Sequence, residues 1–309
     1  MADFDLLVIG DANPDLVLTG DVRPAFGQVE QLVDDARLVV GGSGAIMACG
    51  AARLGLATAF CGVVGDDAFG RFMLEALGAA GVDTRGVVTS REERTGLSVI
   101  LSEGEDRAIL TFPGTIGALE AGSVDLDLVR SARHMHASSY FLQDRLQGGL
   151  PGLFAEARRA GASTSVDPNW DTSERWDGGL TALLEETDIF LPNEAEVRAL
   201  TGREEVEAAG RALAERAGTV AVKCGASGGL AVRGDRVERV AAPPVAVVDT
   251  IGAGDTFDAG FVAGLVAGWP LDRCLRLAVA AGSLSTRGMG GTAAQPTMEE
   301  AVAAAGAGS

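Results

Sequence analysis

The sequence predicts a doubly wound α/β fold, in which helices cover both faces of a mostly parallel sheet and a small β-sheet forms a lid beside it. Two observations carry this prediction. From about residue 134 onward, short apolar runs alternate with segments of helical periodicity, which is the pattern of repeated βα units. Two β-rich segments, about 13–40 and 92–113, do not follow that alternation. We therefore expect a single α/β domain over residues 1–309, with both lid segments inserted in it.

Each expected element has a local signal. Strands are short apolar or β-branched runs, helices show apolar residues at three- and four-residue spacing, and glycines mark helix ends. In the first half these signals predict strands at 6–9, 59–64, 96–101 and 108–112, helices at 41–55 and 69–80, and a hairpin turn at 103–106. In the second half they predict strands at 134–138, 163–166, 189–191, 220–223 and 243–248, a hairpin at 229–240, and helices at 152–160, 179–185, 194–200, 206–216, 255–267 and 271–283. The tail after Ala301 is rich in Ala, Gly and Ser and is expected to be of low complexity.

Composition and charge exclude several classes of protein. The chain has 309 residues, of which 47% are hydrophobic and 22% charged, so wholesale disorder is excluded. Its formal net charge of -18 argues against nucleic acid and anionic membranes as partners, because both need a basic surface. The apolar stretch from Ala259 to Leu271 is shorter than the roughly 20 residues of a membrane span. With four scattered cysteines and no signal peptide, we expect a cytoplasmic protein.

The segment from Asp249 to Gly260 carries the strongest chemical signal. It reads Asp-Thr-Ile-Gly-Ala-Gly-Asp-Thr-Phe-Asp-Ala-Gly, which places a turn of small residues at the start of an expected helix. Small residues at 252–254 let backbone N–H groups converge beside a helix N-terminus and form an anion hole. Asp255, in the first turn, can accept a proton from an alcohol there, as phosphoryl transfer requires. The alternative is an ordinary helix with an Asp cap after a tight turn.

This segment resembles the C-terminal signature of the ribokinase (PfkB) family of carbohydrate kinases. The segment from Gly41 to Gly55, which begins Gly-Gly-Ser-Gly-Ala, resembles the N-terminal signature of that family. Four shorter motifs lie between them in the order of the family: Gly65-Asp66-Asp67 with Gly70, Thr95-Gly96, Asp167-Pro168-Asn169, and Pro192-Asn193-Glu194-Ala195-Glu196. The resemblance covers nearly the whole chain and implies a ribokinase-like fold.

The resemblance implies a role for each matching position near the substrate. Asp255 would be the catalytic base that activates the substrate hydroxyl, and Gly252, Ala253 and Gly254 would form the anion hole. The residues implied to face the sugar hydroxyls are Asn13, Asp15, Gly41, Gly42 and Ser43. Carboxylate and amide side chains suit this task because each can satisfy two hydroxyls. By composition alone, Asn13-Pro14-Asp15 would be a turn.

A nucleotide site and two metal sites are implied in the same way. The residues implied to bind ATP are Asn193, Lys223, Gly225 and Gly228. Lys223 is the only lysine of the chain, and the alternative for it is a solvated residue at a strand end. Glu196 is implied to contact Mg²⁺ through water, although its spacing from Asn193 also fits a capping box. Asp249 and the carbonyl of Ile251, near loop 285–291, resemble the family's monovalent-cation site, which implies K⁺.

The implied activity is ATP-dependent transfer of the γ-phosphoryl group to a hydroxymethyl group of a small carbohydrate. Ile46 stands where the family usually has a sugar-binding Asn, so we expect the sugar or its pose to differ from that of ribose. A phosphorylated sugar remains an alternative acceptor, because arginines in and near the lid segments could bind its phosphate; they are Arg23, Arg91, Arg94 and Arg107. The alternatives are a nucleoside kinase of the same fold and, from another class, a non-catalytic sugar sensor. A lid with a free edge also suggests a homodimer.

Other kinds of site are not expected. The chain has no Gly-x-x-x-x-Gly-Lys-Ser/Thr motif, which excludes a P-loop, and no Gly-x-Gly-x-x-Gly after its first strand, which argues against a dinucleotide enzyme. His134 and His136 alternate on one expected strand without a third ligand nearby, so we expect no metal there.

Overall fold

The protein is described by a computed structural model that covers residues 3–103 and 106–306. Its strands are β1 (Phe4–Ile9), β2 (Asn13–Thr19), β3 (Asp35–Gly41), β4 (Thr58–Gly65), β5 (Asp83–Ser90), β6 (Leu97–Glu103), β7 (Asp106–Phe112), β8 (Ala132–Ala137), β9 (Ser163–Val166), β10 (Ile189–Phe190), β11 (Thr219–Lys223), β12 (Gly229–Arg233) and β13 (Arg236–Val240). Its α-helices are α1 (Ser43–Arg53), α2 (Ala68–Ala79), α3 (Leu126–Arg130), α4 (Asp144–Gln147), α5 (Leu150–Arg159), α6 (Leu180–Leu184), α7 (Glu194–Thr201), α8 (Val206–Ala217), α9 (Ala253–Val266), α10 (Leu271–Ser285) and α11 (Met298–Gly306). None of these helices is both long and apolar enough to span a membrane.

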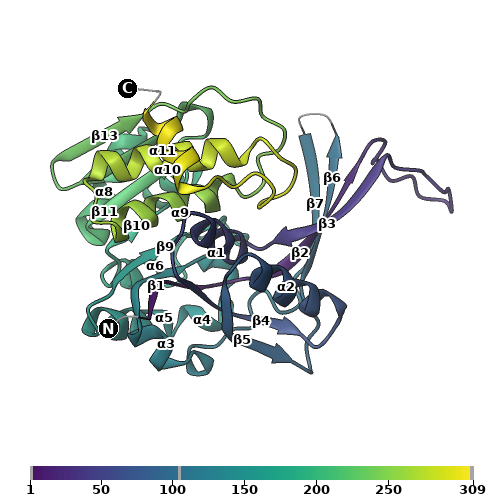
Figure 1. The fold of residues 1–309 in the computed structure, drawn as a ribbon, viewed down its shortest axis with the longest axis horizontal. Coiled ribbons are helices and arrows are strands. Elements are labelled where there is room, and N and C mark those ends of the chain that lie inside the picture. The colour runs from purple at the N-terminus through teal and green to yellow at the C-terminus, as the bar shows by residue number, and fades with distance from the viewer. Residues whose placement is uncertain (1–2, 104–105, 307–309) are drawn as a thin grey trace.

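The described strands form a large sheet and a separate small one (Figure 1). The large sheet has the order β13-β12-β11-β10-β9-β8-β1-β4-β5. Neighbours from β11 to β5 are parallel, whereas β12 pairs antiparallel with β11 and β13 pairs antiparallel with β12. The predicted doubly wound, mostly parallel sheet is therefore confirmed.

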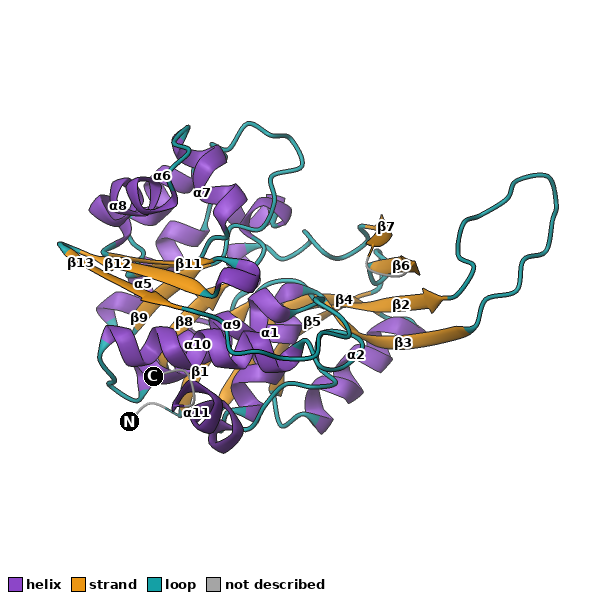
Figure 2. Cartoon of the chain, turned by 90° about the horizontal axis from the view of Figure 1, so that it is seen from above, coloured by secondary structure: helices purple, strands orange, loops and turns teal. Residues whose placement is uncertain are grey.

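Successive residues of the central strand β1 pack into two different cores. Leu7 and Ile9 belong to a cluster with residues of α3, α5, α6 and α8. Leu6 and Val8 belong to a cluster with residues of α1, α2, α9 and α10. Because neighbouring strand residues point to opposite faces of a sheet, this alternation places one helical layer on each face, as Figure 2 shows.

The small sheet has the order β3-β2-β6-β7 and extends away from the main sheet in both views (Figures 1 and 2). It is built from the two segments that were predicted to form a lid. Its base lies at the carboxyl end of β1, because β2 starts shortly after β1 ends and β3 leads directly into α1. The hairpin turn expected at 103–106 includes Gly104 and Glu105, which lie outside the described residues.

Several elements differ from the prediction. The strand expected at 243–248 is wrong, because this segment joins no sheet in the described chain. Pro243 and Pro244 lack an N–H group to donate to a neighbouring strand. The tail expected to be of low complexity carries α11. This helix begins with a capping box: Thr297 N–H donates to the Glu300 carboxylate, and Glu300 N–H donates to the Thr297 hydroxyl. Strand β5 and the short helices α3 and α4 were not predicted.

Candidate active site

The carboxyl ends of the parallel strands border a cavity of about 660 Å³. This is the edge at which open α/β sheets bind ligands. Many of the residues proposed from the sequence line this cavity: Ser43, Asn193, Glu196, Lys223, Gly225, Gly228, Ala253, Gly254 and Asp255. The structure thus brings together side chains and turns that lie as far apart in the sequence as α1 and α9.

The turn before α9 has the geometry that its small residues allow. Gly252 is the N-cap in a left-handed conformation (φ 71°), and a Cβ there would lie 2.6 Å from the Cα of Gly291. The helix begins at Ala253, two residues before the expected start, so Asp255 lies in its first turn. The amides of Gly254 and Asp255 border the cavity and have no hydrogen-bond acceptor among residues 3–103 and 106–306. Such free amides at a helix N-terminus favour an anion.

Asp255 is surrounded by groups that disfavour its charge. Burial and the negative charge of Asp167 raise the pKa of the Asp255 carboxyl to about 8, although Lys223 acts in the opposite direction. A carboxyl with a pKa near neutrality is suited to general base catalysis, because it binds a proton firmly and still ionises near pH 7.

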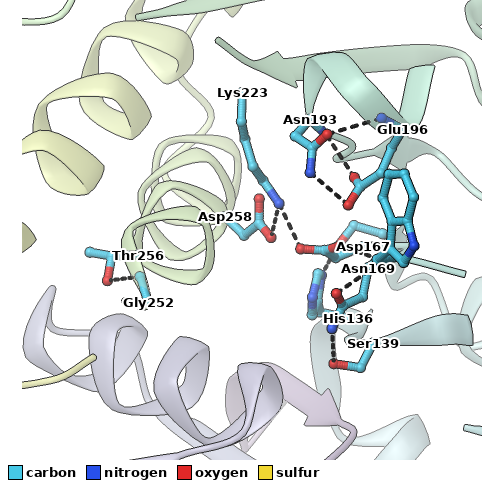
Figure 3. A network of polar contacts seen from close by, with 12 residues as sticks. His136, Ser139, Asp167, Asn169, Asn193, Glu196, Lys223, Gly252, Thr256 and Asp258 are labelled. Atoms are coloured by element: carbon cyan, nitrogen blue, oxygen red, sulfur yellow. Dashed lines mark hydrogen bonds and ion pairs between the residues drawn. The ribbon is translucent and has the colours of Figure 1, made fainter. Parts of the chain in front are cut away.

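Lys223 is held between two carboxylates in this cavity (Figure 3). Its Nζ lies 2.6 Å from Oδ2 of Asp167 and 2.8 Å from Oδ2 of Asp258. Only 13% of the lysine side chain is exposed, so the alternative of a solvated strand-end residue is wrong. Burial lowers the pKa of Lys223, but the two carboxylates outweigh it and raise the pKa overall. The lysine is therefore a permanent cation beside the turn, with its Cδ 3.5 Å from the place where a Cβ of Gly254 would lie.

Glu196 and Asn193 form the capping box that their spacing allowed. The amide of Asn193 donates to Oε2 of Glu196 (2.7 Å), and the amide of Glu196 donates to Oδ1 of Asn193 (3.0 Å). The side-chain amide of Asn193 also donates to Oε1 of Glu196, as Figure 3 shows. Burial and the charge of Asp167 raise the pKa of Glu196 to about 7. Both residues nevertheless line the cavity, so they can contact a ligand while they cap the helix.

The residues proposed to face the sugar meet at the base of the lid. Strand β2 pairs Asn13 with Gly41 of β3, so the alternative of an Asn-Pro-Asp turn is wrong. Asn13 and Asp15 are buried, and a Cβ at Gly41 would overlap the Asp15 carboxylate. A Cβ at Gly42 would lie 3.1 Å from the Asn13 side-chain oxygen. This compact group borders the cavity at Ser43 rather than lining it.

The two residues proposed for a monovalent cation lie beside the expected loop. The Asp249 carboxylate accepts hydrogen bonds from the amides of Ile251 (3.0 Å) and Gly290 (2.8 Å), which ties the turn to loop 285–291. The carboxylate also faces the guanidinium of Arg107, with Nη1 3.6 Å from Oδ1. An oxygen donor is therefore present for a cation, but its charge is already shared with an arginine.

Ile46 occupies the space between the turn and that loop. Its side chain is buried, and its Cγ2 lies 2.9 Å from the place where a Cβ of Gly252 would be. Its methyl groups also fill the space beside Gly291. This position therefore packs apolar atoms between the turn and the loop.

Four residues of the site were not assigned a role from the sequence. Asp11 accepts hydrogen bonds from the amides of Ser43 (3.2 Å) and Gly44 (3.1 Å), and so caps α1. Asp167, Asn169 and Asp258 complete the surroundings of Lys223. Asp167 directly follows a predicted strand and Asp11 follows another after Gly10, which was a usable signal for a site at the carboxyl edge. For Asp258, the only sequence signal was its spacing of three residues from Asp255 on the same helix.

The two histidines have structural partners. His134 and His136 are buried, and both accept or donate hydrogen bonds with serine hydroxyls of β9. Burial lowers the pKa of each imidazole to about 3, so both are neutral. His136 lies close to Asp167, which opposes this shift.

Comparison with known proteins identifies the family of this chain. The model of the pfkB family of carbohydrate kinases matches residues 3–298. The chain belongs to this family. Among its pfkB relatives, an uncharacterized sugar kinase from Archaeoglobus fulgidus is 36% identical over 231 residues, which cover 74% of this chain and 90% of that protein. A ribokinase from Arabidopsis thaliana is 32% identical over 311 residues, covering 94% of this chain and 78% of the relative.

Solved structures of pfkB kinases show the same fold. Arabidopsis thaliana ribokinase, complexed with ribose and ATP, has a TM-score of 0.85 at 28% identity and covers 99% of both chains. A structure from Escherichia coli provisionally named ribokinase II, in complex with ATP and Mg²⁺, has a TM-score of 0.87 at 26% identity and covers 97% of this chain and 98% of the other. The fold is thus ribokinase-like. The protein is a carbohydrate kinase, a phosphotransferase that acts on an alcohol group.

Proposed function

We propose that this kinase transfers the γ-phosphoryl group of ATP to a hydroxymethyl group of a small carbohydrate, with Asp255 as the base. The observation that carries the proposal is the juxtaposition of Asp255, the free amides of its helical turn and the Lys223 ammonium at one cavity. The base, the anion hole and a fixed cation are the groups that phosphoryl transfer needs.

The cavity offers a place for each part of the nucleotide. Part of its lining is apolar and suits a purine ring; it includes Pro243, Pro244, Val245, Val247 and Val279. Gly225 and Gly228 border the same space, where backbone can approach a ligand closely. The phosphates would then reach the amides of residues 252–255 and the Lys223 ammonium. ATP is also the ligand of the two ribokinase structures.

Glu196 fits a water-mediated contact with Mg²⁺. Its carboxylate lines the cavity, and each of its oxygens can accept a further hydrogen bond beyond the one from Asn193. Mg²⁺ would enter with ATP and neutralise charge on the phosphates. We propose K⁺ at Asp249 and the Ile251 carbonyl, where it would share the Asp249 carboxylate with Arg107.

The acceptor would lie between the base of the lid and the turn. Asn13 and Asp15 would hold its hydroxyls, with Gly41, Gly42 and Ser43 leaving room for the ring. The hydroxymethyl group would point at Asp255, which takes its proton as the oxygen attacks the γ-phosphorus. The amides of the turn and Lys223 would stabilise the negative charge on the phosphoryl oxygens. The apolar Ile46 would favour a sugar, or a pose, that needs no hydrogen bond there.

The raised pKa of Asp255 predicts a pH dependence. Only the ionised carboxylate can accept the proton, so kcat/KM for the sugar should rise with pH through about 8 and level off above it. Initial rates between pH 6 and 9.5, at saturating ATP and Mg²⁺, measure this. A kcat/KM that is constant over that range would show that ionisation of Asp255 does not limit the reaction.

We also propose that the lid mediates a homodimer. Large apolar side chains are exposed on it, including Phe26, Leu32, Leu110 and Phe112, and β7 leaves one edge of the lid sheet open. Light scattering after size-exclusion chromatography should give about twice the chain mass of 31.5 kDa. A monomeric mass at micromolar protein would contradict the proposal.

A substrate panel tests the proposed function. Pentoses, hexoses, sugar acids and nucleosides are each incubated with ATP and Mg²⁺, and ADP formation is measured. We expect turnover with at least one free sugar. Turnover of nucleosides alone would favour the nucleoside kinase, and thermal stabilisation by sugars without ADP formation would favour the sensor.

A further inference from the structure

Arg107 of the lid contacts residues 249–252, the turn before α9, which we call the catalytic turn. Arg107 lies on β7, paired with Ser102 of β6, and its Nη1 donates a hydrogen bond of 3.0 Å to Oγ1 of Thr250. The same Nη1 lies 3.6 Å from Oδ1 of Asp249. Arg107 and Thr250 are 143 residues apart in the sequence, so this contact joins the lid to a distant part of the chain.

The partners of Arg107 are central to the geometry of the turn. Asp249 holds the amides of Ile251 and Gly290, and Gly252 packs directly against Gly291. Thr250 borders the cavity two residues before the N-cap of α9. A shift of Asp249 or Thr250 would therefore also shift the segment that carries the anion hole and Asp255.

The other lid arginines do not make such a contact in the described part of the chain. Arg23 pairs with Glu103 and Arg37 pairs with Asp35, so both ion pairs stay within the lid. Arg94, at the start of the second lid segment, has no ion pair among residues 3–103 and 106–306. The charge contact between a lid guanidinium and the turn is thus specific to Arg107.

We propose that Arg107 is a positioning residue that fastens the lid to the catalytic turn through Thr250 and Asp249. This inference rests on the proposed function, since it assigns the contact to the step in which the acceptor is enclosed. The Arg107 side chain is 38% exposed, so the contact contributes only modestly to stability and can break and form again. Loss of the contact should weaken the binding of the acceptor more than that of ATP, because the acceptor lies under the lid.

Hydrogen exchange of the free protein tests the contact without any assay of activity. In Arg107→Ala, the amides of β6, β7 and residues 249–252 should exchange at least about threefold faster than in the wild type. Arg23→Ala is the matched control, because it removes a lid ion pair that does not reach the turn, and it should leave residues 249–252 unchanged. Unchanged exchange at both segments in Arg107→Ala would overturn the proposal, whether or not the protein phosphorylates a sugar.

Kinetics with the best sugar of the panel then test the role in the reaction. Arg107→Ala should raise the KM of the sugar by roughly fivefold or more while the KM of ATP changes less than about twofold, and Arg107→Lys should restore part of the loss. In a Thr250→Val background, the same arginine substitution should have a clearly smaller effect. Fully additive effects of the two substitutions, or an equal rise of both KM values together with a lower Tm, would overturn the proposal. If no compound in the panel is phosphorylated, the proposed function fails, and the exchange experiment alone decides on the contact.

Discussion

Replacement of Asp255 by Asn is expected to lower kcat by at least ~10³-fold, because the amide cannot accept the proton of the attacking hydroxyl. The fold should be unaffected. Burial already disfavours the charge of this carboxyl, so a neutral amide of the same shape removes no stabilising ion pair. Steady-state rates and thermal unfolding of the purified variant measure the two effects separately.

Asp272→Asn is the matched control for this substitution. Asp272 also lies in the first turn of a helix, α10, but it does not line the cavity. Its replacement should change kcat by less than about twofold. An Asp255→Asn protein that turns over at close to the wild-type rate would exclude Asp255 as the base.

Replacement of Lys223 by Met is expected to have the second largest effect. It removes the cation beside the turn, so kcat should fall by about 10²-fold as the charge on the phosphoryl oxygens loses a partner. It also leaves Asp167 and Asp258 buried without their common ion pair. Breaking a buried pair in this way should lower the free energy of unfolding by about 3 kcal/mol. Chemical denaturation and steady-state kinetics measure these effects.

A double variant separates charge balance from catalysis. Lys223→Met with Asp258→Asn removes the lysine together with one of its two acidic partners, and so leaves only Asp167 as a buried acidic group of the cluster of Lys223, Asp167 and Asp258. We expect it to recover most of the stability and little of the activity. Recovery of both would mean that Lys223 acts only as a structural counterion.

Local patterns in the sequence were sufficient to predict most of the fold. The catalytic turn and the Gly-rich start of α1 are short segments whose small residues have a direct conformational meaning. Elements without such a signal were missed. Strand β5 has few apolar residues and is half-exposed at the edge of the sheet. Helix α11 is rich in alanine, and this composition was interpreted as low complexity. The Thr297 and Glu300 capping pair was a signal that could have found α11.

The polar cluster of the site could be predicted only in part. Asp255 and Lys223 stood out because of their neighbours in the sequence and the uniqueness of the lysine. Their meeting with Asp167 and Asp258 depends on how β9, β11 and α9 converge at the sheet edge, which no local pattern contains. The contact of Arg107 with Thr250 also depends on the position of the lid. The sequence showed an arginine there but not its partner.

The fate of the γ-phosphoryl group tests the central claim most directly. ATP labelled with ¹⁸O on its γ-phosphoryl oxygens is incubated with the enzyme, Mg²⁺ and the best sugar of the panel, and the products are analysed by mass spectrometry. The proposal predicts a sugar phosphate that carries three labelled oxygens, with its ester oxygen supplied by the sugar, and no such product from the Asp255→Asn variant. Labelled inorganic phosphate as the sole phosphorylated product besides ADP would contradict transfer to a sugar hydroxyl.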